Sequence, residues 1–259
     1  MTPETETLRV DGHAVTIARG GSGAPLVCLH DVLGPRWNPL PARLARGRTV
    51  VLPALAGFPG SDYREDLDTM EDLAFWTLAL LEQRGLTGVD VVAEGFGGWV
   101  AAEVACRWPS TFRRIALLAP FGLRLSAAPP GPLFECRPAG LRAALFADPE
   151  SPLALATCPD FPSSLEQFEA KLVADRAAAR FAWRPYLHDP KLATRLRRVG
   201  APTLVLWGSA DRLFAPAYAE AWRAALPAAE ATIIEGGGHL LGLERPDVVA
   251  ELVERFLAR

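Results

Sequence analysis

A turn between a strand and a helix is the part of this chain best suited to present a catalytic side chain. Segment 89–100 begins with β-branched residues that favour an enclosed strand, and its composition becomes helical from Trp99. The turn between them has the form small-x-nucleophile-x-small, a sharp bend that normally exposes a nucleophile at its tip. Ala93 and Gly97 occupy the small positions, and the tip is Gly95. The sequence therefore predicts the bend but supplies no nucleophile for it.

Two other interpretations of this turn are weaker. If Glu94 were the nucleophile, bulky Val92 and Phe96 would occupy the small positions. The run 95–98 also resembles a dinucleotide-binding loop, but the motif G-x-G-x-x-G requires glycine where Val100 stands. A dinucleotide-binding loop also follows the first strand of its fold, whereas this run follows a central strand. Glycine at the tip adopts a strained backbone conformation at no steric cost. A site released from nucleophilic catalysis and an inactivating Ser→Gly substitution would both leave this sequence.

The elements that must position this turn follow an alternation of apolar strands and helices. We expect strands at 25–30, 49–53, 89–92, 114–120, 203–208 and 231–235, and an edge hairpin of 7–10 and 14–17 joined by Asp11-Gly12. Helices are expected at 69–81, from 99 to near Pro109, and at 246–257. Thr69 and Asp72 resemble a capping box. The alternation predicts a largely parallel α/β sheet with right-handed crossovers.

One segment, between Pro120 and Val199, shows no clear strand–helix alternation. It contains four prolines within 129–138, and its later part, 165–182, has helical composition. We expect residues 121–198 to form a lid inserted into a core made of 1–120 and 199–259. Several aromatic residues in or beside this segment could line a pocket or only pack the lid: Phe121, Phe134, Phe146, Trp183 and Tyr186.

The composition argues against several classes of function. The formal net charge is −3, from 27 basic and 30 acidic residues, and no basic run indicates nucleic-acid binding. No apolar stretch is long enough to span a membrane, and the acidic N-terminus lacks the features of a signal peptide. The cysteines are widely spaced, which favours free thiols in the cytoplasm over disulfides or a metal site: Cys28, Cys106, Cys136 and Cys158.

Five motifs lie at suitable spacing along the chain. They are 30–34 (H-G-x-x-G, with Asp31 at the first glycine), 55–62 (similar to P-G-x-G-x-S-D), 93–98 (the turn above), 206–211 (W-G-x-x-D) and 236–239 (G-x-x-H). Together they resemble the α/β-hydrolases of the epoxide hydrolase, esterase and C–C-bond hydrolase type, over nearly the whole chain. The resemblance implies the α/β-hydrolase fold, a mostly parallel doubly wound sheet with an inserted, largely helical lid. We expect no cofactor and no metal.

The resemblance also implies roles for individual residues. Asp211 matches the acid and His239 the histidine of the hydrolase triad, and Gly95 stands at the nucleophile position. In that triad the acid orients the histidine, which takes the proton of the nucleophile. The backbone N–H groups of Val32 and Phe96 match the donors of the oxyanion hole. Alternatively, His239 could be a structural histidine, and Asp211 could simply cap a turn.

Three more side chains are expected near the pocket. His30 is expected to shape its loop rather than to act in catalysis. Asp31 stands where the family has glycine, and a carboxylate there would oppose negative charge at the oxyanion position and favour protonation of His239. Glu94 stands next to the tip, at a position where members of the family vary. We therefore expect a site that is ill-suited to a tetrahedral oxyanion.

Three functions are compatible with these residues. The first is an enzyme without a serine nucleophile, in which His239 and Asp211 act as a general base on a small, largely apolar organic substrate. Its reaction could be a hydrolysis, or resemble that of the lyases and cofactor-free oxygenases of this fold. The second is a non-catalytic protein that binds a small ligand under the lid. The third is a conventional serine hydrolase inactivated by Ser→Gly at position 95.

Overall fold

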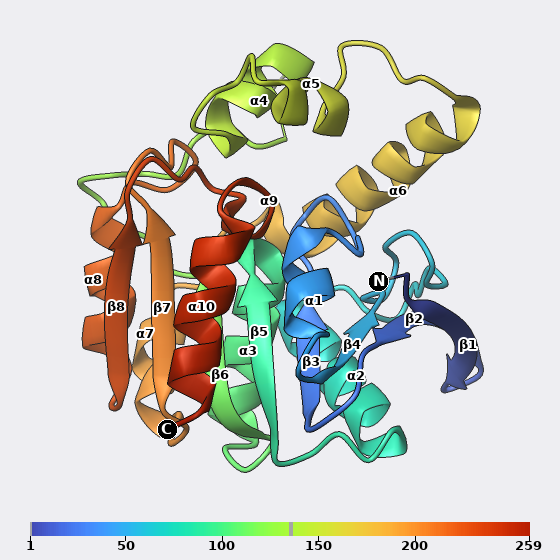
Figure 1. Ribbon diagram of the computed structural model, residues 1–259, viewed down its shortest axis with the longest axis vertical. Coiled ribbons are helices and arrows are strands. Elements are labelled where there is room, and N and C mark those ends of the chain that lie inside the picture. Colours follow the sequence, from blue (N-terminus) through green and yellow to red (C-terminus); the bar gives the residue numbers. More distant parts are fainter. Residues whose placement is uncertain (1, 135–136) are drawn as a thin grey trace.

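A sheet of eight strands forms the centre of the computed structural model, which describes residues 2–134 and 137–259. The strand order is β1-β2-β4-β3-β5-β6-β7-β8 (Figure 1). The strands are β1 (Glu4–Val10), β2 (His13–Gly20), β3 (Pro25–Leu29), β4 (Thr49–Pro53), β5 (Val89–Glu94), β6 (Phe112–Leu118), β7 (Thr203–Gly208) and β8 (Ala229–Ile234). Strands β4, β3, β5, β6, β7 and β8 pair in parallel, whereas β2 pairs antiparallel with β1 and β4. The predicted mostly parallel sheet is confirmed.

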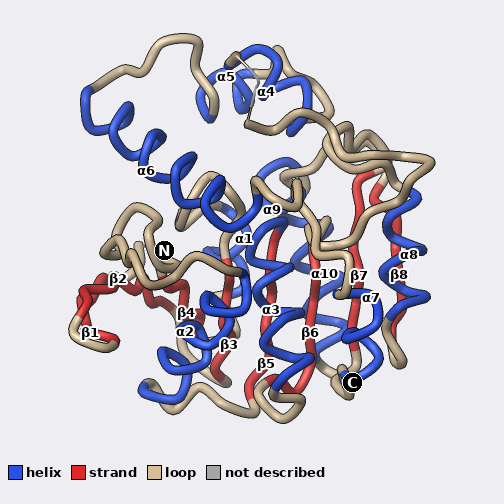
Figure 2. Tube along the Cα trace, turned by 180° about the vertical axis from the view of Figure 1, so that it is seen from behind, coloured by secondary structure: helices blue, strands red, loops and turns tan. Residues whose placement is uncertain are grey.

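The helices either cover the two faces of this sheet or lie in the segments that connect its strands. They are α1 (Pro39–Leu44), α2 (Met70–Gln83), α3 (Gly95–Arg107), α4 (Pro138–Leu145), α5 (Pro152–Thr157), α6 (Leu165–Ala182), α7 (Leu192–Arg195), α8 (Ala217–Ala225), α9 (Leu241–Glu244) and α10 (Pro246–Leu257). Helices α1 and α10 lie on one face, and α2 and α3 on the other (Figures 1 and 2). The sheet accordingly separates two apolar clusters, one containing Leu40 and Val249 and the other containing Leu80 and Val104.

The elements with the strongest sequence patterns lie where they were predicted. The edge hairpin turns at Asp11 and Gly12, both with positive φ (49° and 83°), which is the geometry of a two-residue hairpin loop. Thr69 and Asp72 form the predicted capping box at the start of α2. Helices α6 and α10 have the predicted bounds. The short helices α1, α4, α5, α7, α8 and α9 were not predicted.

The turn between β5 and α3 is tighter than the composition indicated. Helix α3 begins at Gly95 itself, with φ +47°, rather than near Trp99. Gly97 lets the first turn of α3 approach β3, because a Cβ atom there would lie only 2.5 Å from the carbonyl oxygen of His30. The N–H of Gly97 instead donates to that oxygen at 3.0 Å. The two glycines therefore fix the position of the turn against the neighbouring strand.

The insertion between β6 and β7 carries α4 to α7, and its helices α4, α5 and α6 lie over the carboxyl ends of the parallel strands (Figure 1). Its start and its returning segment meet at Gly122. The N–H of Gly122 donates to the carbonyl of Leu187, and the N–H of Asp189 donates to the carbonyl of Gly122, both at 3.0 Å. The insertion therefore leaves and rejoins the core at neighbouring points.

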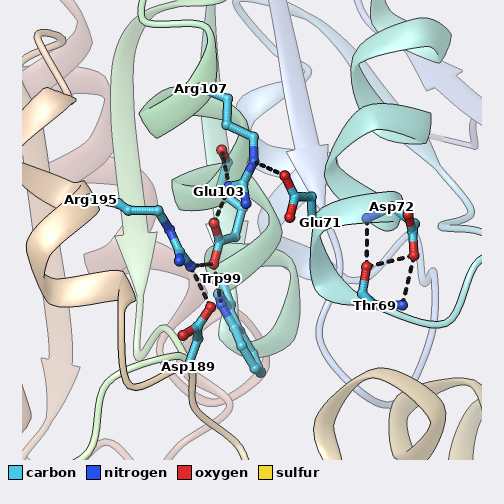
Figure 3. Close-up of polar contacts among 8 residues, drawn as sticks. All are labelled: Thr69, Glu71, Asp72, Trp99, Glu103, Arg107, Asp189 and Arg195. Atoms are coloured by element: carbon cyan, nitrogen blue, oxygen red, sulfur yellow. Dashed lines mark hydrogen bonds and ion pairs between the residues drawn. The ribbon is translucent and has the colours of Figure 1, made fainter.

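A buried carboxylate fastens this returning segment to α3 (Figure 3). The side chain of Glu103 is 1% exposed and accepts hydrogen bonds from Trp99 Nε1 at 3.1 Å and from Arg195 at 2.7 Å. Arg107, one turn further along α3, also pairs with Glu103. Arg195 donates in addition to Asp189 at 2.5 Å. The base of the insertion is thus joined by ion pairs to the helix that begins at Gly95.

Two further sequence expectations concern the chain as a whole. Within the described residues, no helix is both long and apolar enough to cross a membrane. Cys28, Cys106 and Cys158 are buried thiols, and Cys136 lies outside the described residues.

Candidate active site

Asp211 and His239 meet at the carboxyl ends of β7 and β8. His239 Nδ1 lies 2.8 Å from Asp211 Oδ2, and both side chains are almost fully buried. The other carboxylate oxygen, Oδ1, accepts the N–H groups of Leu213 and Phe214, each at 2.9 Å. Asp211 therefore caps its own turn and also holds the histidine ring, so the two interpretations of this residue are compatible. With Nδ1–H directed at the carboxylate, Nε2 of a neutral ring is the free acceptor.

Position 95 faces that free nitrogen. A Cβ atom on Gly95 would lie 3.2 Å from His239 Nε2, and 3.4 Å from both Asp31 Cβ and Phe121 Cε1. Nε2 is buried and has no hydrogen-bond partner among the described residues. The structure thus brings together Gly95, Asp211 and His239 as the sequence motifs indicated. At position 95 the site therefore consists of the histidine nitrogen Nε2 and the backbone of the turn.

The charges around His239 favour its protonated form. Burial alone lowers the pKa of the imidazole, but the adjacent Asp211 carboxylate and, further away, those of Asp31 and Glu94 raise that pKa above its ordinary value. The expectation that Asp31 favours protonation of His239 agrees with this direction. A base that binds protons more tightly is also a stronger proton acceptor once it is neutral.

Asp31 and Glu94 share a small cavity of about 30 Å³ on the α1 side of the sheet, together with Arg36. Asp31 Oδ1 accepts the N–H of Leu33 at 2.6 Å, and burial raises the pKa of its carboxyl group. Glu94 accepts the N–H of Gly242 at 2.9 Å, while burial and then the charge of Asp31 raise its pKa to about 7. Asp31 also remains close to position 95, since its Cβ lies 3.4 Å from a Cβ atom placed there, so the expectation that its carboxylate opposes an oxyanion stays a prediction.

His30 is held by backbone groups at both ring nitrogens. Nδ1 lies 2.7 Å from the carbonyl oxygen of Asp31, and the N–H of Leu55 donates to Nε2 at 3.0 Å. This arrangement requires the neutral Nδ1–H tautomer, and burial, with a smaller effect of Arg36, lowers the pKa of His30 to about 4. The geometry suits a residue that shapes the loop after β3, as expected.

Two larger cavities lie beneath the insertion. The Cys158 cavity, of about 390 Å³, is lined by residues that include Cys158, Pro59, Arg36 and Pro138, and the Trp183 cavity, of about 430 Å³, by residues that include Trp183, Phe134, Val32 and Leu172. Leu33, Leu141, Lys171 and Asp175 border both. On the core side, their linings reach Val32 and Leu33, at the loop that carries Asp31.

The aromatic residues of the insertion divide between pocket and core. Phe134 and Trp183 line the Trp183 cavity. Phe121 and Phe146 are fully buried, and the Phe121 ring lies 5.5 Å from the ring of His239.

Phe96, whose N–H was assigned to the oxyanion hole, packs its ring 5.3 Å from Phe58. Val32, the other assigned donor, borders the Trp183 cavity.

Sequence reasoning missed the contacts that surround His239 from the insertion. These come from segment 143–147 at the end of α4 and just beyond it, which Arg212 and Glu244 of the core bind; Phe121, already named as a possible pocket residue, also packs against the histidine ring. No local sequence pattern identifies them, because each depends on which part of the insertion returns to the histidine loop.

Comparison with known proteins agrees with the fold and the motif order. Residues 26–252 match the alpha/beta hydrolase family, and the chain belongs to this family. The α/β-hydrolase fold is thereby confirmed, with its helical insertion between β6 and β7.

Two relatives and one solved structure are distant in sequence but align over most of their length. An uncharacterised protein of Mycobacterium tuberculosis is 26% identical over 283 residues, covering 98% of this chain and 81% of that protein. A 2-hydroxymuconate semialdehyde hydrolase of Pseudomonas putida is 26% identical over 278 residues, covering 95% and 92%. The solved structure of 2-hydroxy-6-oxo-6-phenylhexa-2,4-dienoate hydrolase from a Rhodococcus strain has a TM-score of 0.78 at 23% identity and covers both chains completely.

Proposed function

We propose that this protein is an enzyme in which His239, oriented by Asp211, acts as a general base without a covalent nucleophile at position 95. The observation that carries the proposal is the 2.8 Å contact from Asp211 to Nδ1, which leaves a buried Nε2 that faces Gly95 and has no hydrogen-bond partner in the described part of the chain. A base placed in this way can remove a proton from water or from an acidic position of a substrate. Glycine at the tip leaves no hydroxyl to compete for that nitrogen.

The substrate we propose is a small, largely apolar organic molecule that enters between the insertion and the loop after β3. The Cys158 and Trp183 cavities support this, because their linings are mostly apolar and their volumes suit small molecules. Relatives named as hydrolases of 2-hydroxymuconate semialdehyde make hydrolysis the favoured reaction.

The test uses p-nitrophenyl butyrate as a small apolar ester. We expect slow turnover, of the order that a hydrolase without its full triad retains (about 10³–10⁴-fold over water), with no acyl adduct detectable by mass spectrometry. A fluorophosphonate should leave the protein unlabelled. His239→Ala should abolish turnover, whereas His13→Ala in the edge hairpin should not. Turnover that survives His239→Ala would reject the proposal.

A second candidate function is the binding of a small ligand without chemistry. The observation in its favour is that the linings of the two cavities reach Val32 and Leu33, whereas Nε2 of His239 is buried. This candidate predicts saturable binding of an apolar ligand that is recovered unchanged, and this binding should be insensitive to His239→Ala.

Gly95→Ser tests whether the protein is a serine hydrolase inactivated at position 95, since gained esterase activity would reveal an otherwise intact serine hydrolase.

A further inference from the structure

The end of α4 is hydrogen-bonded to the backbone of the candidate base. The carbonyl oxygen of Leu145 accepts the N–H of His239 at 2.9 Å and that of Leu240 at 3.2 Å. Leu145 belongs to the insertion, and His239 belongs to the loop after β8. The position of the insertion and the position of the histidine are therefore directly linked.

Glu244 of α9 adds a second link. One carboxylate oxygen accepts the N–H of Ala147 at 2.8 Å, and the other accepts the N–H of Gly238 at 2.9 Å. Gly238 precedes His239, and Ala147 lies two residues beyond α4, so one side chain bridges the two segments. The approach depends on glycine, because a Cβ atom at position 238 would lie 2.5 Å from both Ala147 N and Glu244 Oε2.

Arg212 adds a third link, next to the acid of the pair. Its guanidinium donates to the carbonyl oxygens of Ala143 at 3.3 Å, Phe146 at 3.1 Å and Ala147 at 3.2 Å. We call segment 143–147 the strap. The residue after Asp211, the residue before His239 and His239 itself all bind to it, directly or through Glu244.

We propose that Glu244 is a positioning residue, which clamps the strap to the histidine loop and so holds His239 in place and keeps its Nε2 covered. The insertion can then uncover this nitrogen only when the strap is released. The inference rests on the proposed function in treating His239 as the base. Its structural content, a bridge between the strap and the histidine loop, stands on the contacts alone.

The experiment measures access to each histidine rather than turnover. Diethyl pyrocarbonate modifies neutral, accessible imidazole nitrogens, and peptide mass spectrometry reports the rate at each residue at pH 8. In the unaltered protein His239 should react slowly. Glu244→Ala should increase that rate by at least about tenfold, the change expected when one or two hydrogen bonds holding a local structure are lost. Buried His30 should stay protected, which shows that the remaining fold is intact.

Glu251→Ala is the matched control, because Glu251 is an exposed carboxylate on the neighbouring helix α10. It should leave both histidine rates unchanged. If Glu244→Ala does not fold, Glu244→Gln, which can accept only one of the two N–H groups, and Arg212→Ala replace it, with the same expected direction. An unchanged rate at His239, or an increase that His30 shares, would overturn the proposal. Because no step depends on turnover, this result is separable from failure of the proposed reaction.

Discussion

The charges of Asp211, Asp31 and Glu94 all raise the pKa of His239, and these carboxylates differ in the backbone N–H groups that they accept. Asp211 accepts two backbone N–H groups and binds the ring itself. Asp31 and Glu94 each accept one backbone N–H, from Leu33 and Gly242. A carboxylate with few donors in a buried place is stabilised in its protonated form. Glu94 is accordingly the group whose protonation should change within the physiological pH range.

The first prediction concerns the stability of Glu94→Gln as a function of pH. The pKa of Glu94 is raised to about 7, so the folded protein keeps a proton that the unfolded chain releases above its ordinary pKa of 4.5. Stability contributed by this proton is present at low pH and is lost as the pH rises toward 7. Glutamine cannot ionise, so the variant should gain stability relative to the unaltered protein between pH 5 and 8, by on the order of 2 kcal/mol.

Urea unfolding of both proteins at pH 5 and pH 8 measures this difference. Glu251→Gln, an exposed carboxylate on α10, should show no comparable change. A Glu94→Gln variant whose stability follows that of the unaltered protein at both values would show that Glu94 is ionised throughout.

At the scale of elements, α3 connects the turn at Gly95 with the base of the insertion. Gly95 is its first residue, and Glu103, two turns further, binds Arg195 of α7 (Figure 3). Removing this carboxylate takes one ion-pair partner from Arg107 and Arg195, each of which keeps another, and leaves the buried Trp99 Nε1–H without an acceptor, which costs about 1–3 kcal/mol. We therefore expect Glu103→Ala to lower the free energy of unfolding by an amount in this range, measured by urea denaturation.

Glu71 provides the matched comparison. It pairs with the same Arg107 at 3.4 Å, but its side chain is 60% exposed. Exposed ion pairs contribute about 0–1 kcal/mol, so Glu71→Ala should change stability little. An equal decrease in the free energy of unfolding for both variants would show that the burial of Glu103 does not increase its contribution to stability.

The elements that sequence predicted well are those whose patterns are local. The Asp11-Gly12 hairpin, the capping box at Thr69 and the amphipathic helix α10 each depend on a few neighbouring residues. The turn at Gly95 was also placed correctly, because small residues at fixed spacing are required by close packing. The start of α3 was not, because its first turn consists mainly of glycines and its helical conformation is imposed by contact with β3.

The environment of the candidate site was less accessible to sequence reasoning. Asp31 was expected near the site and lies beside position 95, but the backbone N–H of Leu33 that binds its side chain could not be predicted. The contact between the strap and Glu244 is non-local, because Ala147 and Glu244 are about a hundred residues apart in the chain. Such pairings follow from the path of the insertion, which no short motif encodes.

For the whole molecule, the insertion has two halves that different parts of the core hold. The first half, with α4 and α5, is bound through the strap to the loops after β7 and β8. The second half, with α6, is bound through Arg180, which donates to the carbonyls of Leu67 and Glu65, each at 2.6 Å. Between α5 and α6 the chain is exposed, and Phe161 and Leu165 are 86% and 71% accessible.

Because this connection is exposed, a protease should cleave it and leave the protein as two chains that stay associated. Thermolysin, which cleaves before large apolar residues, should cut first ahead of Phe161 or Leu165 and yield two fragments that co-elute in gel filtration, because β6 and β7 remain paired across the break. Fragments that separate without denaturant would contradict this. Gly95 would then lie on one polypeptide, and Asp211 and His239 on the other. The candidate site could therefore be assembled by mixing two separately produced pieces, with each half altered independently before they are combined.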